Sequence, residues 1–142
     1  MGKCYNSTVV NAPVDKVWAA LRNFHDASWA PHVVEKLDVV GEAKGDQIGA
    51  KRVLNGAFHE TLHALDDVNM TIRYSIDDGP GPVAKDAIRN YVGTVKVMAV
   101  TSNNTTFVEW ASVYDSPNSG AVGELCDPIY SALLKDLAAT VG

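Results

Sequence analysis

An arginine and a glutamate fall on the inward face of two neighbouring strands that the sequence predicts. Every second residue of a strand points to the same face. In 48–54 the face with Ile48, Ala50 and Leu54 also carries Arg52, and in 58–64 the apolar face also carries Glu60. A turn at 55–56, Asn-Gly, joins the two strands as a hairpin. The two charged side chains are therefore predicted to lie within pairing distance.

Two interpretations of this pair stay open. An isolated buried charge is costly, so Arg52 and Glu60 are expected to meet each other or a polar ligand. As catalytic groups, Glu60 would transfer a proton and Arg52 would stabilise negative charge on a substrate. As a structural feature, the ion pair would only fix the sheet. Both interpretations allow the pair to contact a ligand.

The inward faces of the other strands are rich in aromatic residues. Parity directs four aromatic side chains inward from three strands, with Ser112 as a hydroxyl among them. Apolar walls with a few polar groups are typical of small-molecule pockets. The candidate ligand-binding residues are Arg52, Phe58, Glu60, Leu62, Tyr74, Tyr91, Trp110, Tyr114 and Ile129.

The histidines and cysteines do not indicate a metal site. His59 and His63 share the outward face of one strand, and no third ligand follows at metal-type spacing. Cys4 and Cys126 are expected to be small buried residues. The chain has no glycine-rich phosphate loop, nucleophile elbow or HExxH motif. We therefore expect no metal and no cofactor, and any reaction to proceed by proton transfer.

Strands and one clear helix position these residues. A helix is predicted over about 13–23, with Asn11 near its N-cap, and a short second helix or tight loop over 25–31. Hydrophobic alternation and short turn-type linkers predict a meander of strands. Their ranges are 4–10, 33–41, 48–54, 58–66, 70–76, 89–100 and 105–114.

The C-terminal region predicts one long helix with an apolar stripe that begins near Val122. Pro128 lies within it, which predicts a kink or break near 125–127. The linker 77–87 has two prolines and two glycines and is a candidate flap over a site. The expected fold is α+β: a seven-stranded curved antiparallel sheet around a long C-terminal helix, with one or two short helices after the first strand.

Composition limits the class of protein and its partners. With 142 residues, 46% hydrophobic and 20% charged, the chain is expected to form a single domain over 1–142, with no apolar run near the ~20 residues that span a bilayer. A net charge of −5 with scattered Lys and Arg disfavours a nucleic-acid partner. No signal or transit pattern is present, so a cytoplasmic location, without membrane association, is expected for a monomer or homodimer.

Several motifs together resemble the START and birch-pollen-allergen superfamily of helix-grip domains (SRPBCC), in its polyketide cyclase/dehydrase-like branch. They are APVDKVW at 12–18, GAKR at 49–52, ETLHALD at 60–66 and VEW at 108–110. The resemblance implies the helix-grip fold. It extends to a plant isomerase of this branch whose important arginine, glutamate and tyrosine are matched by Arg52, Glu60 and Tyr91.

Two functions follow as hypotheses. The first is binding of a small, largely apolar organic molecule with a polar or anionic handle in an internal cavity. The second is a cofactor-free cyclase, dehydratase or isomerase that acts by proton transfer through Glu60, with Arg52 and Tyr91. A regulatory module acting through its surface is the third and least supported by the sequence.

Overall fold

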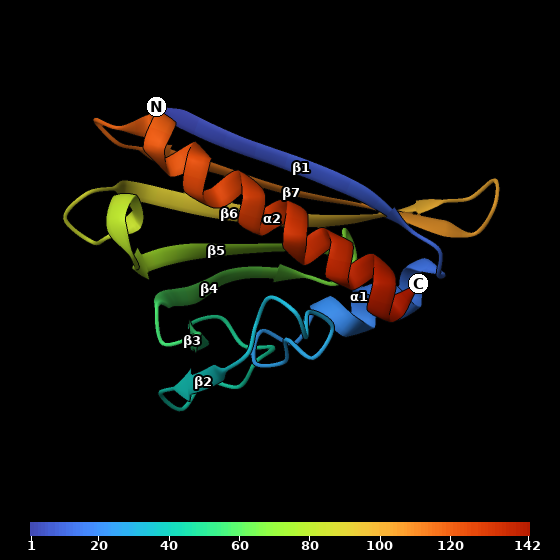
Figure 1. Cartoon of the computed structure of the whole chain (residues 1–142). Coiled ribbons are helices and arrows are strands. Elements are labelled where there is room, and N and C mark those ends of the chain that lie inside the picture. The colour runs from blue at the N-terminus through green and yellow to red at the C-terminus, as the bar shows by residue number, and fades with distance from the viewer.

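The chain folds as an open antiparallel sheet that wraps one face around a long helix (Figure 1). The computed structural model describes all 142 residues. The strands are β1 (Gly2–Val10), β2 (Leu37–Val40), β3 (Lys51–Leu54), β4 (Phe58–Asp66), β5 (Thr71–Asp78), β6 (Arg89–Val100) and β7 (Thr105–Asp115). The helices are α1 (Val14–Leu21), the short 3₁₀ helix η1 (Gly81–Val83) and α2 (Ser119–Val141). The predicted helix-grip α+β fold is confirmed.

The sheet is a meander from β2 to β7, with β1 added at the edge beside β7. Its order is β1-β7-β6-β5-β4-β3-β2, and all neighbours are antiparallel. Asn55 and Gly56, at the β3–β4 turn, both have positive φ, 55° and 64°. Leu54 pairs with Phe58, so the hairpin loop has three residues, 55–57, and this loop length sets Arg52 opposite Glu60. The turn fixes the register of β3 against β4 and thereby the position of the site.

Two predicted strands are shorter than expected. β2 begins only at Leu37 and β3 only at Lys51, because the residues before each are held in turns. Gly49 has a φ of +92°, which interrupts the extended backbone. The inward assignment of Ile48 is therefore wrong: its side chain is 60% exposed. Alternation does not apply outside the strand itself.

The helical predictions also need correction in part. α1 begins at Val14 with Pro13 as its N-cap, so Asn11 is not the cap. Residues 25–31 form turns. Of the two expectations for this segment, the tight loop is correct and the short second helix is not. α2 runs from Ser119 to Val141 without a break, although Pro128 lies inside it. No helix has both the length and the apolar character that crossing a membrane requires.

The core lies between the concave face of the sheet and α2. It is one cluster of 29 buried residues, to which β1 and every strand from β4 to β7 contribute. α1 and the loop after it close one end of the sheet, beneath the C-terminal half of α2 (Figure 1). The candidate flap is folded down, since Val83 is fully buried and the Asp78 carboxylate accepts hydrogen bonds from the backbone N–H groups of Gly79 and Lys85.

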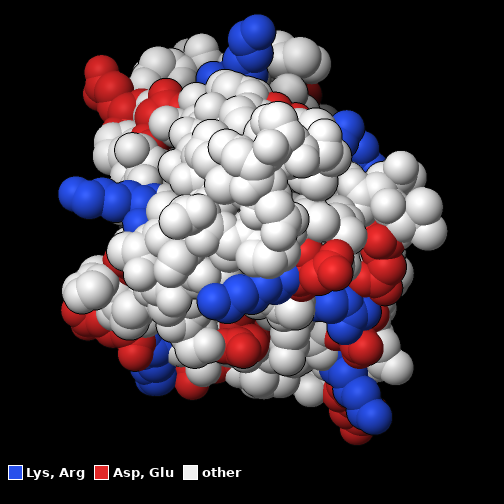
Figure 2. Space-filling model, turned by 90° about the vertical axis from the view of Figure 1, so that its right-hand side faces the viewer, with Lys and Arg blue, Asp and Glu red and all other residues white.

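The surface carries interspersed charges of both signs. On the face shown in Figure 2, Lys and Arg side chains alternate with Asp and Glu around a broad uncharged area. No large cluster of one sign is visible on this face.

Candidate functional site

A cavity of about 170 Å³ lies between the sheet, the loop 24–36 and α2. Thirteen of its 16 lining residues are hydrophobic, which makes it an apolar site with few polar groups. The lining residues are Ala27, Trp29, Val33, Val34, Arg52, Leu54, Asn55, Phe58, Glu60, Tyr74, Ile76, Trp110, Cys126, Ile129, Tyr130 and Leu133.

The charged pair of the wall is formed by directly opposed residues of β3 and β4. Arg52 and Glu60 are cross-strand partners, and both side chains are buried. Arg52 donates from Nε to Oε1 of Glu60 at 2.8 Å, and its Nη2 lies 2.7 Å from the same oxygen. Arg52 Nη1 donates to the carbonyl of Phe24 at 3.0 Å, and the guanidinium lies 3.8 Å from the centre of the Phe24 ring. The predicted pairing is thus present, with the arginine fixed on two further sides.

The two oxygens of Glu60 have different environments. Both bonds from Arg52 go to Oε1, and no protein group donates to Oε2. Burial raises the pKa of Glu60, and the adjacent Arg52 guanidinium offsets part of that rise. Because Glu60 lines the cavity, Oε2 is the oxygen left for a ligand.

The loop 24–36 forms the outer wall and is held in place by side chains. Asn55 Oδ1 accepts hydrogen bonds from the backbone N–H groups of Glu35 and Lys36, and its Nδ2 donates to the carbonyl of Val33. On the other side, the Asp136 carboxylate of α2 binds both the backbone N–H and the ring of His32. These contacts bring Val33, Val34 and Trp29 to the cavity without regular secondary structure.

A second polar group of the cavity wall is a chain of buried tyrosine hydroxyls. Trp110 Nε1 donates to the hydroxyl of Tyr74 at 2.9 Å, and this hydroxyl lies 3.0 Å from that of Tyr130. The Tyr130 hydroxyl is hydrogen-bonded to that of Tyr91, which in turn lies 3.6 Å from Cys126 Sγ. Burial raises the pKa of all three tyrosines well above the ordinary value, so they are neutral at physiological pH.

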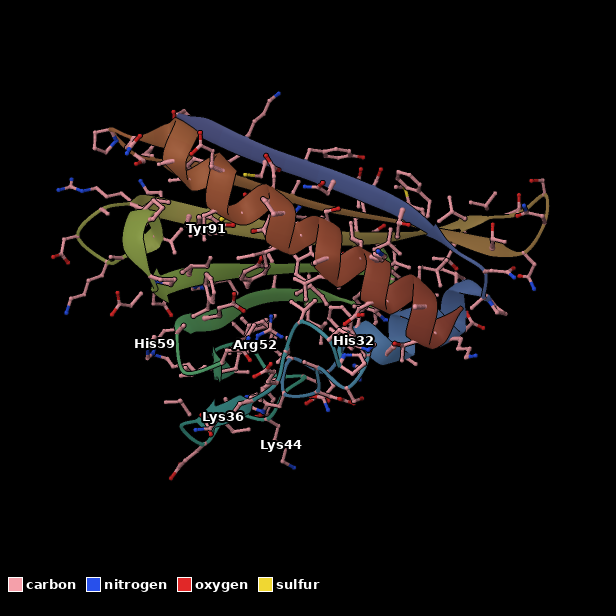
Figure 3. The ribbon with its side chains drawn as sticks, in the orientation of Figure 1. His32, Lys36, Lys44, Arg52, His59 and Tyr91 are labelled. Atoms are coloured by element: carbon pink, nitrogen blue, oxygen red, sulfur yellow. The ribbon has the colours of Figure 1, made fainter.

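Three of the nine residues expected to contact a ligand are not in the cavity wall. Leu62 is fully buried in the core, two residues beyond Glu60 on the same face of β4. Tyr91 stacks on Tyr114, with ring centres 5.7 Å apart, under the first half of α2. Figure 3 shows Tyr91 beneath this part of the helix, apart from Arg52 on β3. Parity predicted that all three side chains point inward, and all three are buried, but α2 covers Tyr91 and Tyr114 through Cys126, Tyr130 and Ser119.

Six of the nine expected residues do line the cavity. They are Arg52, Phe58, Glu60, Tyr74, Trp110 and Ile129. Sequence reasoning missed Tyr130, although it lies four residues after Cys126 and three before Leu133, on the same helix face. It also missed the loop residues, for which strand and helix periodicity give no signal.

The cysteines and histidines take no part in a cluster of metal-ligand type. Cys4 and Cys126 are free and buried, as expected, and burial raises the pKa of the Cys126 thiol to about 11. No group of three or more His, Cys, Asp or Glu side chains is placed to hold a metal ion. His59 lies on the outer side of the sheet, away from Arg52 (Figure 3).

Comparison with known proteins agrees with this architecture. A protein of Nitrosospira multiformis is 46% identical, and its solved structure matches with a TM-score of 0.95 over 99% of this chain and 96% of that chain. A protein of Thermobifida fusca, 25% identical, matches with a TM-score of 0.80 over 97% of this chain and 91% of its own. XoxI of Bacillus cereus, 23% identical with a TM-score of 0.81 over 99% and 96%, shares the fold. No curated protein matches the chain.

The family assignment rests on the whole chain. Residues 1–142 match the family described as polyketide cyclase/dehydrase and lipid transport. The helix-grip fold, with its cavity between sheet and helix, agrees with the resemblance that the sequence motifs indicate. The chain therefore belongs to the polyketide cyclase/dehydrase and lipid transport family of the START-like superfamily.

Proposed function

We propose that this protein binds a small, largely apolar organic molecule in the cavity, with the polar group of that molecule against Arg52 and Glu60. The observation that carries the proposal is an apolar cavity whose buried ion pair keeps one carboxylate oxygen, Oε2 of Glu60, without a protein partner. A polar atom in such a place is costly unless a ligand or water satisfies it.

The size of the cavity limits the ligand. An engineered protein cavity of about 150 Å³ accommodates benzene, and this one encloses about 170 Å³. Trp29 and Trp110, whose rings lie 6.0 Å apart, form part of its wall. A single aromatic ring with short substituents fits this space.

Filling the cavity is expected to abolish binding without unfolding the protein. Ile129 lies on α2 in the cavity wall and is only half-buried, so Ile129→Phe projects extra volume into the space. We expect 4-fluorotoluene to give a saturable ¹⁹F NMR shift with the unmodified protein. Its affinity is expected to fall at least tenfold in Ile129→Phe, about the loss of one favourable apolar contact.

The matched control is Val113→Phe, which adds a ring on β7 at an exposed position outside the cavity. It is expected to bind 4-fluorotoluene like the unmodified protein. Equal affinity in all three proteins would place the probe elsewhere and contradict the proposed cavity.

A second candidate function is catalysis of a proton transfer in the same cavity. It is favoured by the raised pKa of Glu60, which is what a general base near neutral pH needs. In this proposal Oε2 of Glu60 takes a proton from a carbon next to a carbonyl. The electron pair moves to the carbonyl oxygen, giving an enolate that Arg52 stabilises. Tyr91 does not contact the substrate and acts only indirectly, through its hydrogen bond to Tyr130.

Hydrogen exchange tests this candidate without knowledge of the natural substrate. 2-Indanone in D₂O exchanges its α-protons, and the exchange is followed by ¹H NMR. The protein is expected to accelerate it by about 10²- to 10⁴-fold over buffer if Glu60 is the base. Glu60→Gln is expected to lose this acceleration, whereas His59→Gln, which removes an exposed titratable group next to it in sequence, keeps it. Equal rates in the two variants would eliminate Glu60 as the base.

A further inference from the structure

The tyrosine hydroxyls of the cavity wall are arranged in one direction. The indole N–H of Trp110 only donates, so the Tyr74 oxygen is an acceptor in that bond. The only acceptor within reach of the Tyr74 O–H is then Tyr130, whose own O–H passes to Tyr91. Tyr91 donates to Cys126. The O–H groups of Tyr74, Tyr130 and Tyr91 are thus all used inside the protein. Only acceptor lone pairs are left on Tyr74 and Tyr130 for a ligand.

The other polar groups of the wall have mostly used their donors as well. Trp29 Nε1 donates to the carbonyl of Asp26. Arg52 has five N–H groups and uses three of them on Glu60 and the Phe24 carbonyl. Its remaining N–H groups belong to a guanidinium that is already bound to a carboxylate. An anion that reached Arg52 would therefore also meet Glu60.

Acceptors, in contrast, remain available. Oε2 of Glu60 receives no hydrogen bond from the protein. The ion pair with Arg52 has no net charge, so the wall does not attract an anion, and Arg52 disfavours a cation beside it. The polar side of the cavity is thus matched to a neutral group that donates a hydrogen bond.

We infer that the ligand carries a neutral hydrogen-bond donor, a phenolic or enolic hydroxyl on an apolar ring, which donates to Oε2 of Glu60. This inference rests on the proposed binding function and narrows it, because it excludes the anionic handle that the sequence left open. A carboxylate accepts a strong hydrogen bond from a hydroxyl, and a site built for a hydroxyl rejects the analogue that lacks it.

Competition against 4-fluorotoluene, followed by ¹⁹F NMR at pH 7.5, tests the inference. The competitors are p-cresol, toluene and 4-methylbenzoate, which share one ring and one methyl group and differ in the second substituent. We expect p-cresol to displace the probe at a concentration about 10- to 100-fold lower than toluene, the effect of one hydrogen bond to a charged group. 4-Methylbenzoate is expected to be the weakest of the three.

Two variants locate the effect. In Glu60→Gln the preference for p-cresol over toluene is expected to shrink to within about threefold, since the amide oxygen is a weaker acceptor than a carboxylate. In His59→Gln, with its side chain on the outer side of the sheet, the preference is expected to be unchanged. An unchanged preference in Glu60→Gln would overturn the assignment to Oε2.

The remaining outcomes separate the inference from the proposed function. Equal displacement by p-cresol and toluene, or tightest binding of 4-methylbenzoate, overturns the inferred donor although the cavity still binds. If 4-fluorotoluene fails to bind and p-cresol binds in a direct titration of Trp fluorescence, the donor is required and the inference is supported. If neither binds, the proposed function and the inference both fail.

Discussion

Replacing Arg52 by methionine is expected to lower the free energy of unfolding by about 3–5 kcal/mol at pH 7.5, because it leaves a buried carboxylate without its cation. Both members of the pair are buried, Arg52 with 8% and Glu60 with 6% of its surface exposed. The variant also removes the donor to the Phe24 carbonyl. This is the largest effect that we expect from a single substitution at the site.

The loss is expected to depend on pH in a defined direction. Burial already raises the pKa of folded Glu60 above that of the unfolded chain. A raised carboxyl pKa contributes stability that is present at low pH and is lost as pH rises through the folded pKa. Without Arg52 the pKa rises further, so the variant loses stability more steeply with pH. The difference between Arg52→Met and the unmodified protein is therefore expected to be smaller at pH 5 than at pH 8.

Urea unfolding at both pH values measures this difference. In the double variant Arg52→Met/Glu60→Met most of the lost stability is expected to return, because apolar replacement of a whole buried pair is often neutral or stabilising. A loss that is equal at pH 5 and pH 8, or a double variant no more stable than the single one, would show that the charge of Glu60 is not the cause.

Gly93→Ala is expected to destabilise the protein by about 1–3 kcal/mol, the range for overpacking a core. Gly93 pairs with Tyr74 across β5 and β6. A methyl group at Gly93 would overlap the Tyr74 ring at Cζ and Cε1 and its hydroxyl. The ring would have to move, and its hydroxyl would leave Trp110 and Tyr130. The glycine therefore makes room for the aromatic group at the centre of the cavity wall.

Thermal unfolding and one double variant test this explanation. Gly120→Ala, in the first turn of α2 with no atom near the added methyl group, is the matched control and is expected to be neutral or slightly stabilising. Gly93→Ala/Tyr74→Leu is expected to be more stable than the sum of the two single effects predicts, because leucine vacates the space. Strictly additive effects would mean that Gly93 does not act through Tyr74.

The sequence predicts the regular part of this fold well, because its sheet has one buried face. Strict alternation in β5, β6 and β7 identifies Tyr74, Tyr91 and Trp110 as inward residues, and all three are buried. Alternation misplaced Ile48, which lies in a turn before β3 rather than in the strand. Proline at position 128 predicted a kink or break in α2, but the helix runs unbroken from Ser119 to Val141 with Pro128 at an exposed position.

The site is predicted only in part, because some of its geometry is set locally and the rest by long-range packing. The Arg52–Glu60 pair follows from strand parity and a short hairpin loop, which are local properties of the chain. Which inward residues face open space depends on how α2 and the loop 24–36 pack, and this depends on long-range contacts such as His32 with Asp136. Strand patterns therefore identified Arg52 and Glu60 correctly. They also predicted that Tyr91 and Tyr114 line the cavity, but α2 covers both side chains.

The pairing of β1 with β7 has a consequence for how the chain folds during synthesis. The partners are far apart in sequence: Cys4 and Tyr114, which are in side-chain contact, are separated by 110 positions. At translation rates of 5–20 residues per second, β7 is synthesised on the order of ten seconds after β1. The edge of β1 is unpaired throughout this interval, and the many non-local strand contacts favour slow folding. The ribosome therefore releases most of the sheet before its first strand has anything to pair with.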